Sequence, residues 1–172
     1  MNDKLKVRKA IKGDKDAFRE LIKENYKYLY KVAYMHTKYE EDAKDIVQET
    51  VYKAYKSIGK LKSPEYFKTW ITRILINESN TFLSKIGMID LEDKVAYIKE
   101  EDSEIKVDMN NAIDLLEDKY KNAIILRYYY DLKVDDIAQI LDLNPNTVKT
   151  HIAKGLKVMK KLLKEDYLNE GK

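Results

Sequence analysis

The sequence predicts an all-α fold in which an acidic linker joins two small helical domains, the second containing a helix-turn-helix. Apolar residues recur every three or four positions along most of the chain, as they do in amphipathic helices. Only five glycines and two prolines occur in 172 residues, which disfavours barrels, sandwiches and disorder. Residues 86–110 carry three basic against eight acidic side chains, whereas residues 1–85 carry 19 against 12. We therefore expect domains at residues 1–86 and 110–172 and a linker at residues 87–109.

The composition excludes several classes of site and location. The chain has no cysteine, so disulfides, thiolate zinc sites and cysteine nucleophiles are excluded and a reducing compartment is favoured. The first residues, MNDKLKVRKAIKG, lack the apolar centre of a signal peptide, and no run of eighteen apolar residues occurs. Of the two histidines, His36 and His151, the second has no neighbouring residue of a type that ligates metals. We expect a cytoplasmic protein without a metal or other cofactor.

The first domain is predicted to contain three helices. The first spans about residues 14–36, and the second runs from Glu40, with acidic residues in its first turn, to near Gly59. A short basic connection, SIGKLKSPEYF, follows. Pro64 suits the first position of a third helix that Ser63 caps. The apolar residues of residues 87–109 keep no steady period, which indicates a linker.

The second domain is predicted to consist of helices at about residues 111–130, 134–141 and 145–165. Small Ala138 and apolar Val148, ten residues apart, have the spacing of the two crossing helices of a helix-turn-helix. Asn144 can accept from the exposed amides of the last helix, and Pro145 needs no donor there. One departure is Asp142, because the turn position that requires a left-handed backbone is usually glycine, although aspartate tolerates that conformation better than most residues. The spacing of Ala138 and Val148 and the Asn-Pro start of the last helix predict a DNA-binding motif.

The last helix is expected to have a buried stripe and a DNA-facing side. The stripe comprises Val148, Ile152, Leu156, Met159 and Leu163. The other side presents lysines, amides, hydroxyls and methyl groups. These groups suit the edges of bases in a major groove and the phosphates beside it. Its residues are Asn146, Thr147, Lys149, Thr150, Ala153, Lys154 and Lys157.

Two motifs of the first domain are ambiguous from their residues alone. In DIVQE, the polar residues Asp45, Gln48 and Glu49 lie outside the apolar stripe, as on any solvated helix face. In YFKTWITRI, aromatic residues alternate with Lys68 and Arg73. Such aromatics either stack on unpaired bases or belong to the core.

At these residues the sequence resembles the extracytoplasmic-function group of sigma-70-type bacterial sigma factors. GDKDAFRELI, DIVQETVYKAYKSI, YFKTWITRI and DDIAQILDLNPNTVKTHIAKGLKVMKKL occur in the order typical of that family. The resemblance implies a noncatalytic two-domain factor that binds core RNA polymerase and directs it to promoters.

The resemblance also implies roles for individual residues. Asp45, Gln48 and Glu49 would contact the polymerase. The first domain would bind the minus-ten element through Lys60, Lys62, Tyr66, Phe67, Trp70, Arg73, Asn77 and Asn80. The last helix would read the minus-thirty-five element through Asn146, Thr147, Lys149, Thr150, His151, Lys154 and Lys157. The acidic linker would correspond to the family's connector between the two domains.

The resemblance further implies an inhibitory anti-sigma factor, usually anchored in the membrane, and a response to envelope or extracellular stress. The chain itself is expected not to insert into the membrane. A conventional helix-turn-helix regulator that binds operator DNA without polymerase is the alternative, although it leaves DIVQE and the Trp70 segment without a role. An enzyme acting on DNA is disfavoured, because the sequence contains no catalytic constellation.

Overall fold

The computed structural model describes the backbone of residues 3–89 and 109–169 and the side chains of residues 4–85 and 112–163. Every regular element in these ranges is helical, which confirms the all-α prediction. The chain divides into two compact units, Met1–Glu92 and Asp93–Lys172, called here the N-terminal and C-terminal units. Most of the predicted linker, residues 90–108, lies outside the described residues.

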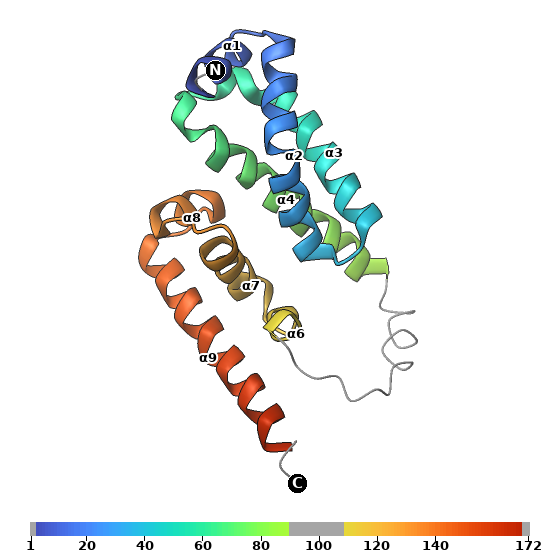
Figure 1. Ribbon diagram of the computed structural model, residues 1–172, viewed down its shortest axis with the longest axis vertical. Helices are drawn as coiled ribbons and strands as arrows, with labels where there is room; N and C mark the ends of the chain where they lie inside the picture. The colour runs from blue at the N-terminus through green and yellow to red at the C-terminus, as the bar shows by residue number, and fades with distance from the viewer. Residues whose placement is uncertain (1–2, 90–108, 170–172) are drawn as a thin grey trace. The chain divides into compact units, whose positions relative to one another are not determined.

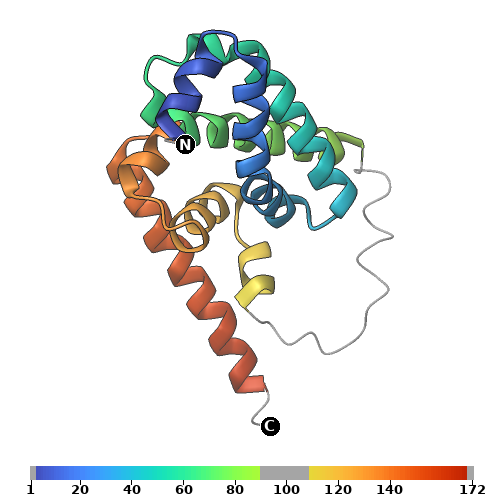
Figure 2. The ribbon, with the colours of Figure 1, turned by 45° about the horizontal axis from the view of Figure 1, so that its top comes forward.

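The N-terminal unit packs α2 (Lys15–Thr37), α3 (Glu40–Ser57) and α4 (Phe67–Ile89) side by side, and α1 (Asp3–Ile11) contacts α2 (Figure 1). Figure 2 shows α1 near the start of α2. The core is built from fully buried aliphatic side chains of the three long helices, including Leu29, Val32, Ile46, Ile71 and Leu75. Helix α4 continues to Ile89, so the first residues of the predicted linker are helical.

The boundaries of α2 follow from its local sequence. Asp14 adopts an extended backbone, and its side chain accepts from the amides of Asp16 and Ala17 at 3.0 Å each, which satisfies two exposed donors. At the other end, Lys38 adopts a left-handed backbone with a φ of 64°. The boundaries agree closely with the predicted helix at residues 14–36.

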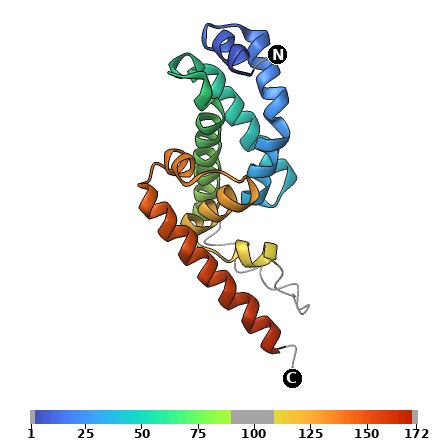
Figure 3. The same cartoon turned by 60° about the vertical axis from the view of Figure 1, so that its left-hand side comes forward.

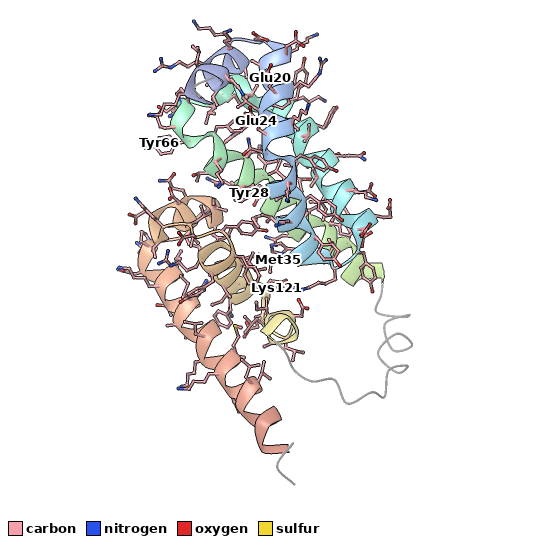
Figure 4. The ribbon with its side chains drawn as sticks, in the orientation of Figure 1. Glu20, Glu24, Tyr28, Met35, Tyr66 and Lys121 are labelled. Atoms are coloured by element: carbon pink, nitrogen blue, oxygen red, sulfur yellow. The ribbon has the colours of Figure 1, made fainter. Side chains whose placement is uncertain are left out.

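Helix α1 was not predicted, and tertiary contacts explain why it forms. The segment DKLKVRKAI has few apolar residues, of which Val7 and Ala10 are buried. The buried ammonium of Lys6 pairs with Glu24 and, at 3.6 Å, with Glu20. Figure 4 marks these two glutamates on α2. Because a buried ammonium needs a partner, these contacts favour one position of α1 on α2.

The connection between α3 and α4 consists of two short 3₁₀ turns, Ile58–Lys60 and Pro64–Tyr66. Pro64 occupies the first position of the second turn, as the sequence predicts. The side chain of Ser63 makes no capping hydrogen bond, so the predicted Ser63 cap is wrong. The helix proper begins three residues after Pro64, at Phe67.

The C-terminal unit begins with α6 (Met109–Asp114) and α7 (Asp118–Ile124), which continues as a π-helical turn, Ile125–Tyr129. The single helix predicted at residues 111–130 is therefore wrong in detail. A turn closed by a 3.2 Å bond from the Leu116 amide to the Ile113 carbonyl separates α6 from α7. After the π turn, the guanidinium of Arg127 donates to the Leu132 carbonyl at 3.0 Å.

Helices α8 (Val134–Leu141) and α9 (Pro145–Asn169) form the predicted helix-turn-helix (Figure 3). Asp142 has φ 57° and ψ 46°, the expected left-handed conformation. The amides of Asp142 and Leu143 both donate to the Ala138 carbonyl, the second at 2.9 Å, which ends α8. Asn144 accepts from the Asn146 amide at 2.9 Å, so the predicted cap is confirmed.

Candidate functional site

The predicted polymerase contacts Asp45, Gln48 and Glu49 are exposed on α3. They lie next to the buried Ile46 and Val47, which hold α3 against the rest of the unit. Glu49 is 3.7 Å from the ammonium of Lys53, one turn further along the helix. The packing of α3 therefore presents a polar edge with two carboxylates and an amide.

A groove of about 610 Å³ between α2 and α3 adjoins this edge, and Gln48 belongs to both. Its lining residues are Lys15, Phe18, Arg19, Ile22, Tyr26, Val47, Gln48, Val51, Tyr52 and Tyr55. The Phe18 and Tyr55 rings meet edge to face at 5.4 Å, and Tyr55 is exposed. The groove therefore leaves apolar and aromatic side chains of α2 and α3 open at the surface.

Three tyrosines on α2, which we call the tyrosine ladder, extend from this groove. Tyr26 and Tyr30 stack with ring centroids 6.4 Å apart, and Tyr30 and Tyr34 with centroids 6.2 Å apart. Tyr26 and Tyr34 are exposed. Sequence reasoning missed the groove and the ladder, although the spacing of four residues between these tyrosines was a visible signal.

The predicted minus-ten contacts differ in exposure. Lys60, Lys62, Arg73, Asn77 and Asn80 are exposed, and Trp70 is half-buried. Tyr66 is 49% exposed and points outward in Figure 4.

Phe67, by contrast, is only 5% exposed, and its ring lies 6.0 Å from that of Trp70. Phe67 therefore belongs to the core of the unit. The sequence had left open whether such aromatics are core residues or stacking partners.

Helix α4 is held by polar contacts to both neighbouring helices. The hydroxyls of Tyr28 on α2 and Thr72 on α4 are 2.9 Å apart, and the Lys68 ammonium lies 4.5 Å from the centre of the Tyr28 ring. Burial raises the pKa of Tyr28, so its hydroxyl stays neutral. Lys53 on α3 donates to Glu78 on α4 at 2.6 Å, and this hydrogen bond raises the pKa of Lys53.

The predicted minus-thirty-five contacts lie on α9. Asn146, Lys149, Thr150, Lys154 and Lys157 are exposed, whereas Thr147 is half-buried. The Thr150 hydroxyl donates to the backbone carbonyl of Asn146 at 2.9 Å, and Asn146 itself is exposed.

His151 is turned toward α7 and is half-buried. Its ring meets that of Tyr120 edge to face at 5.5 Å, and its Nδ1 has no hydrogen-bond partner among the described residues. Burial lowers the pKa of His151, and the positive charges of Lys119 and Lys154 lower it further. The folded protein therefore favours a neutral imidazole at this position.

The opposite side of α9 differs from the predicted stripe. Val148 and Met159 are buried and Ile152 and Leu163 are half-buried, but Leu156 is 41% exposed. The burial of Leu156 is therefore a wrong prediction. Gly155 is buried instead, where an added Cβ would lie 2.9 Å from Cγ1 of Ile124. The close approach of α7 and α9 at Gly155 turns Leu156 outward.

The described part of the chain contains neither a metal-binding cluster nor a membrane-spanning helix. Among the side chains of residues 4–85 and 112–163, no group of three His, Asp or Glu is placed to hold a metal ion. None of the helices within residues 3–89 and 109–169 has the length and apolar character needed to cross a bilayer.

Comparisons with known proteins identify two matching family models. The model of sigma-70 region 2 matches residues 21–87, which include α3 and most of α4. The model of sigma-70 region 4 matches residues 106–159, which include the helix-turn-helix. Together the two models cover more than half of the chain.

Known relatives and solved structures agree with these matches. RNA polymerase sigma factor SigV of Bacillus subtilis is 38% identical over 143 residues, covering 80% of this chain and 86% of SigV. The ECF RNA polymerase sigma-E factor of Haemophilus influenzae is 32% identical over 173 residues, covering 88% of this chain and 90% of that factor. The fold resembles sigma factor RpoE in its complex with the anti-sigma factor NepR from Bartonella quintana. That match has a TM-score of 0.71 at 22% identity and covers 86% of this chain and 96% of RpoE. The chain therefore belongs to the extracytoplasmic-function group of sigma-70-type RNA polymerase sigma factors.

Proposed function

We propose that this protein binds core RNA polymerase through its N-terminal unit and directs the polymerase to promoters by contacts from both units. The observation that carries the proposal is the pairing, in one chain, of the polar edge of α3 with a complete helix-turn-helix. A conventional regulator needs only the helix-turn-helix. In this proposal residues 1–86 bind polymerase and the minus-ten element, residues 87–109 connect, and residues 110–172 bind the minus-thirty-five element.

Polymerase binding is assigned to Asp45, Gln48 and Glu49. Their exposure leaves the carboxylates and the amide available to cationic and polar groups of a partner. The groove beside Gln48 supplies apolar area, which a stable protein interface needs at its centre. Carboxylates at a rim contribute mainly to association rate and orientation.

Minus-ten binding is assigned to the loop and helix that carry Lys60, Lys62, Tyr66, Arg73, Asn77 and Asn80, with Trp70 at the margin. Exposed Tyr66 offers a face on which an unpaired base can stack, a contact worth about 1–3 kcal/mol. Phe67 supports this surface from the core rather than contacting DNA.

Minus-thirty-five binding is assigned to Asn146, Lys149, Thr150, Lys154 and Lys157 on the open side of α9. These side chains are exposed at the start of a helix of the type that enters the major groove. Thr147 and His151 are half-buried, so we assign them a supporting role beneath the reading face.

We further propose that a membrane-anchored anti-sigma factor holds this cytoplasmic protein inactive until an envelope or extracellular stress arises. Support comes from the similar RpoE, which was solved with the anti-sigma factor NepR. The exposed groove between α2 and α3 offers apolar surface that such an inhibitor would cover.

Transcription from genomic DNA with purified core polymerase, with and without this protein, tests the proposal. We expect discrete new 5′ ends that share upstream minus-thirty-five and minus-ten elements. An absence of new start sites would overturn the proposal, and tight operator binding without polymerase would favour the conventional regulator.

Variants of two exposed aspartates separate polymerase binding from general effects of charge. Asp45→Ala should weaken binding to core polymerase, measured by fluorescence anisotropy, because it removes a carboxylate from the edge of α3. Asp135→Ala makes the same change of charge on α8 of the C-terminal unit, at a residue that is not among the assigned polymerase contacts, and should leave polymerase affinity unchanged. Equal affinities for both variants would contradict the assignment of the polymerase contacts.

A further inference from the structure

Lys53 connects the two helices of the N-terminal unit to which different functions are assigned. Its ammonium lies 2.6 Å from Oε2 of Glu78 on α4 and 3.7 Å from Oε1 of Glu49 on α3. Glu49 belongs to the proposed polymerase-binding edge. Glu78 follows Asn77 in the sequence, and Asn77 belongs to the proposed minus-ten surface.

The two carboxylates differ in their need for Lys53. The side chain of Glu78 is only 12% exposed, whereas those of Glu49 and Lys53 are 50% and 46% exposed. A carboxylate that is largely removed from water depends on its cationic partner. Glu49 is hydrated and can exchange Lys53 for a cation of a partner protein. The ammonium of Lys53 is therefore bound tightly to Glu78 of α4 and weakly to Glu49 of its own helix.

The contact at Glu78 constrains how α4 is rotated about its axis. Asn77 and Asn80 are three residues apart and share one exposed helix face, on which Arg73 also lies, four residues before Asn77. Ser79, on the other side of Glu78 in the sequence, is fully buried. A rotation that frees Glu78 from Lys53 would therefore also turn Asn77 and Asn80 away from their present direction.

We propose that Lys53 is a positioning residue that fixes the DNA-facing side of α4 relative to the polymerase-facing edge of α3. When polymerase binds, one of its cationic groups pairs with the carboxylate of Glu49, and Lys53 then pairs with Glu78 alone. This inference rests on the proposed function, because it takes Glu49 as a polymerase contact and Asn77 as a minus-ten contact. It assigns no DNA or polymerase contact to Lys53 itself. It predicts that loss of Lys53 impairs promoter opening more than polymerase binding.

The test compares Lys53→Met with Lys44→Met in holoenzyme. Both variants remove an ammonium from α3 and keep an unbranched side chain. Lys44 is 2.6 Å from Glu41 and 4.0 Å from Glu40, both on α3, so its ion pairs do not reach α4. Permanganate reactivity of thymines in a mapped promoter reports opening, and fluorescence anisotropy reports polymerase affinity.

We expect Lys53→Met to form open complexes about fivefold less well at equal polymerase occupancy, the factor that one lost partly buried pair can cause. Lys44→Met should match the wild type, and Lys53→Arg should restore opening. Glu78→Gln keeps a hydrogen-bond acceptor and should lose less. Adding Glu78→Gln to Lys53→Met should have little further effect, because both act on one contact.

Each result has a defined meaning. Equal opening by Lys53→Met and Lys44→Met, or an additive loss in the double variant, would overturn the inference. A parallel loss of polymerase affinity would make Lys53 a contact residue and would also overturn it. If Lys53→Met is unfolded at the assay temperature, Glu78→Gln replaces it in the comparison with Lys44→Met, with the same two measurements of opening and polymerase affinity. A wild-type protein that opens no promoter would instead refute the proposed function.

Discussion

The two units present their proposed DNA contacts in different ways. In the C-terminal unit, the exposed contacts Asn146, Lys149 and Thr150 lie on one side of α9, and buried Val148 lies on the other. In the N-terminal unit, exposed Tyr66 is followed directly by buried Phe67, and Trp70 is half-buried. In the C-terminal unit, different faces of α9 therefore serve DNA recognition and folding stability. In the N-terminal unit, neighbouring side chains share the two roles.

The largest expected effect tests this sharing in the N-terminal unit. Phe67→Ala should lower the free energy of unfolding by about 3–5 kcal/mol, because it leaves a cavity in the core. Tyr66→Ala, one residue earlier, should change it by about 1 kcal/mol or less while weakening minus-ten binding. Urea unfolding followed by circular dichroism measures both. A stable Phe67→Ala protein that fails only in promoter opening would show that Phe67 contacts DNA.

The second effect tests the separation in the C-terminal unit. Lys149→Ala should weaken promoter binding by holoenzyme about tenfold, because it removes an exposed donor from the open side of α9. Its unfolding free energy and polymerase affinity should stay unchanged. Lys160→Ala, three turns further along α9, serves as the control and should have a smaller effect. Loss of polymerase binding by Lys149→Ala would mean that this face of α9 contacts the polymerase.

The third prediction locates the core side of α9 at Gly155. Gly155→Ala should destabilise the protein by about 1 kcal/mol, because the clash with Ile124 exceeds the gain in helix propensity. Leu156→Gln should change stability by about 0.5 kcal/mol or less, because Leu156 is exposed. Thermal or urea unfolding distinguishes the two. A large loss of unfolding free energy in Leu156→Gln would instead show that Leu156 belongs to the buried stripe, as the sequence predicted.

The smallest expected effect concerns His151. Its pKa is lowered in the folded protein, so between that pKa and the unfolded value of about 6.5 the unfolded chain binds more protons. Stability should therefore fall as pH falls through this window. His151→Gln should weaken the dependence of the unfolding midpoint on pH between about 7.5 and 5.5. An identical pH dependence in both proteins would show that His151 is not desolvated against Tyr120.

Much of the C-terminal unit could be predicted because its signals are local. The left-handed Asp142, the Asn144 cap and the ends of α8 depend on residues within one helical turn. Helix α1 could not be predicted in the same way, because Lys6 finds its partners on α2. The π-helical turn and the groove between α2 and α3 likewise depend on contacts between elements.

The sequence by itself determined the helical periodicity, the caps and turns of the helix-turn-helix, and the motif order that indicates the family. Only the tertiary structure decided that Phe67 is buried beside exposed Tyr66, and that Gly155 rather than Leu156 meets Ile124. It also brought Lys53 to Glu78 across two helices. The physical reason is that periodicity assigns a residue to a broad helix face, whereas the neighbouring helix selects which side chains at the edge of that face are covered.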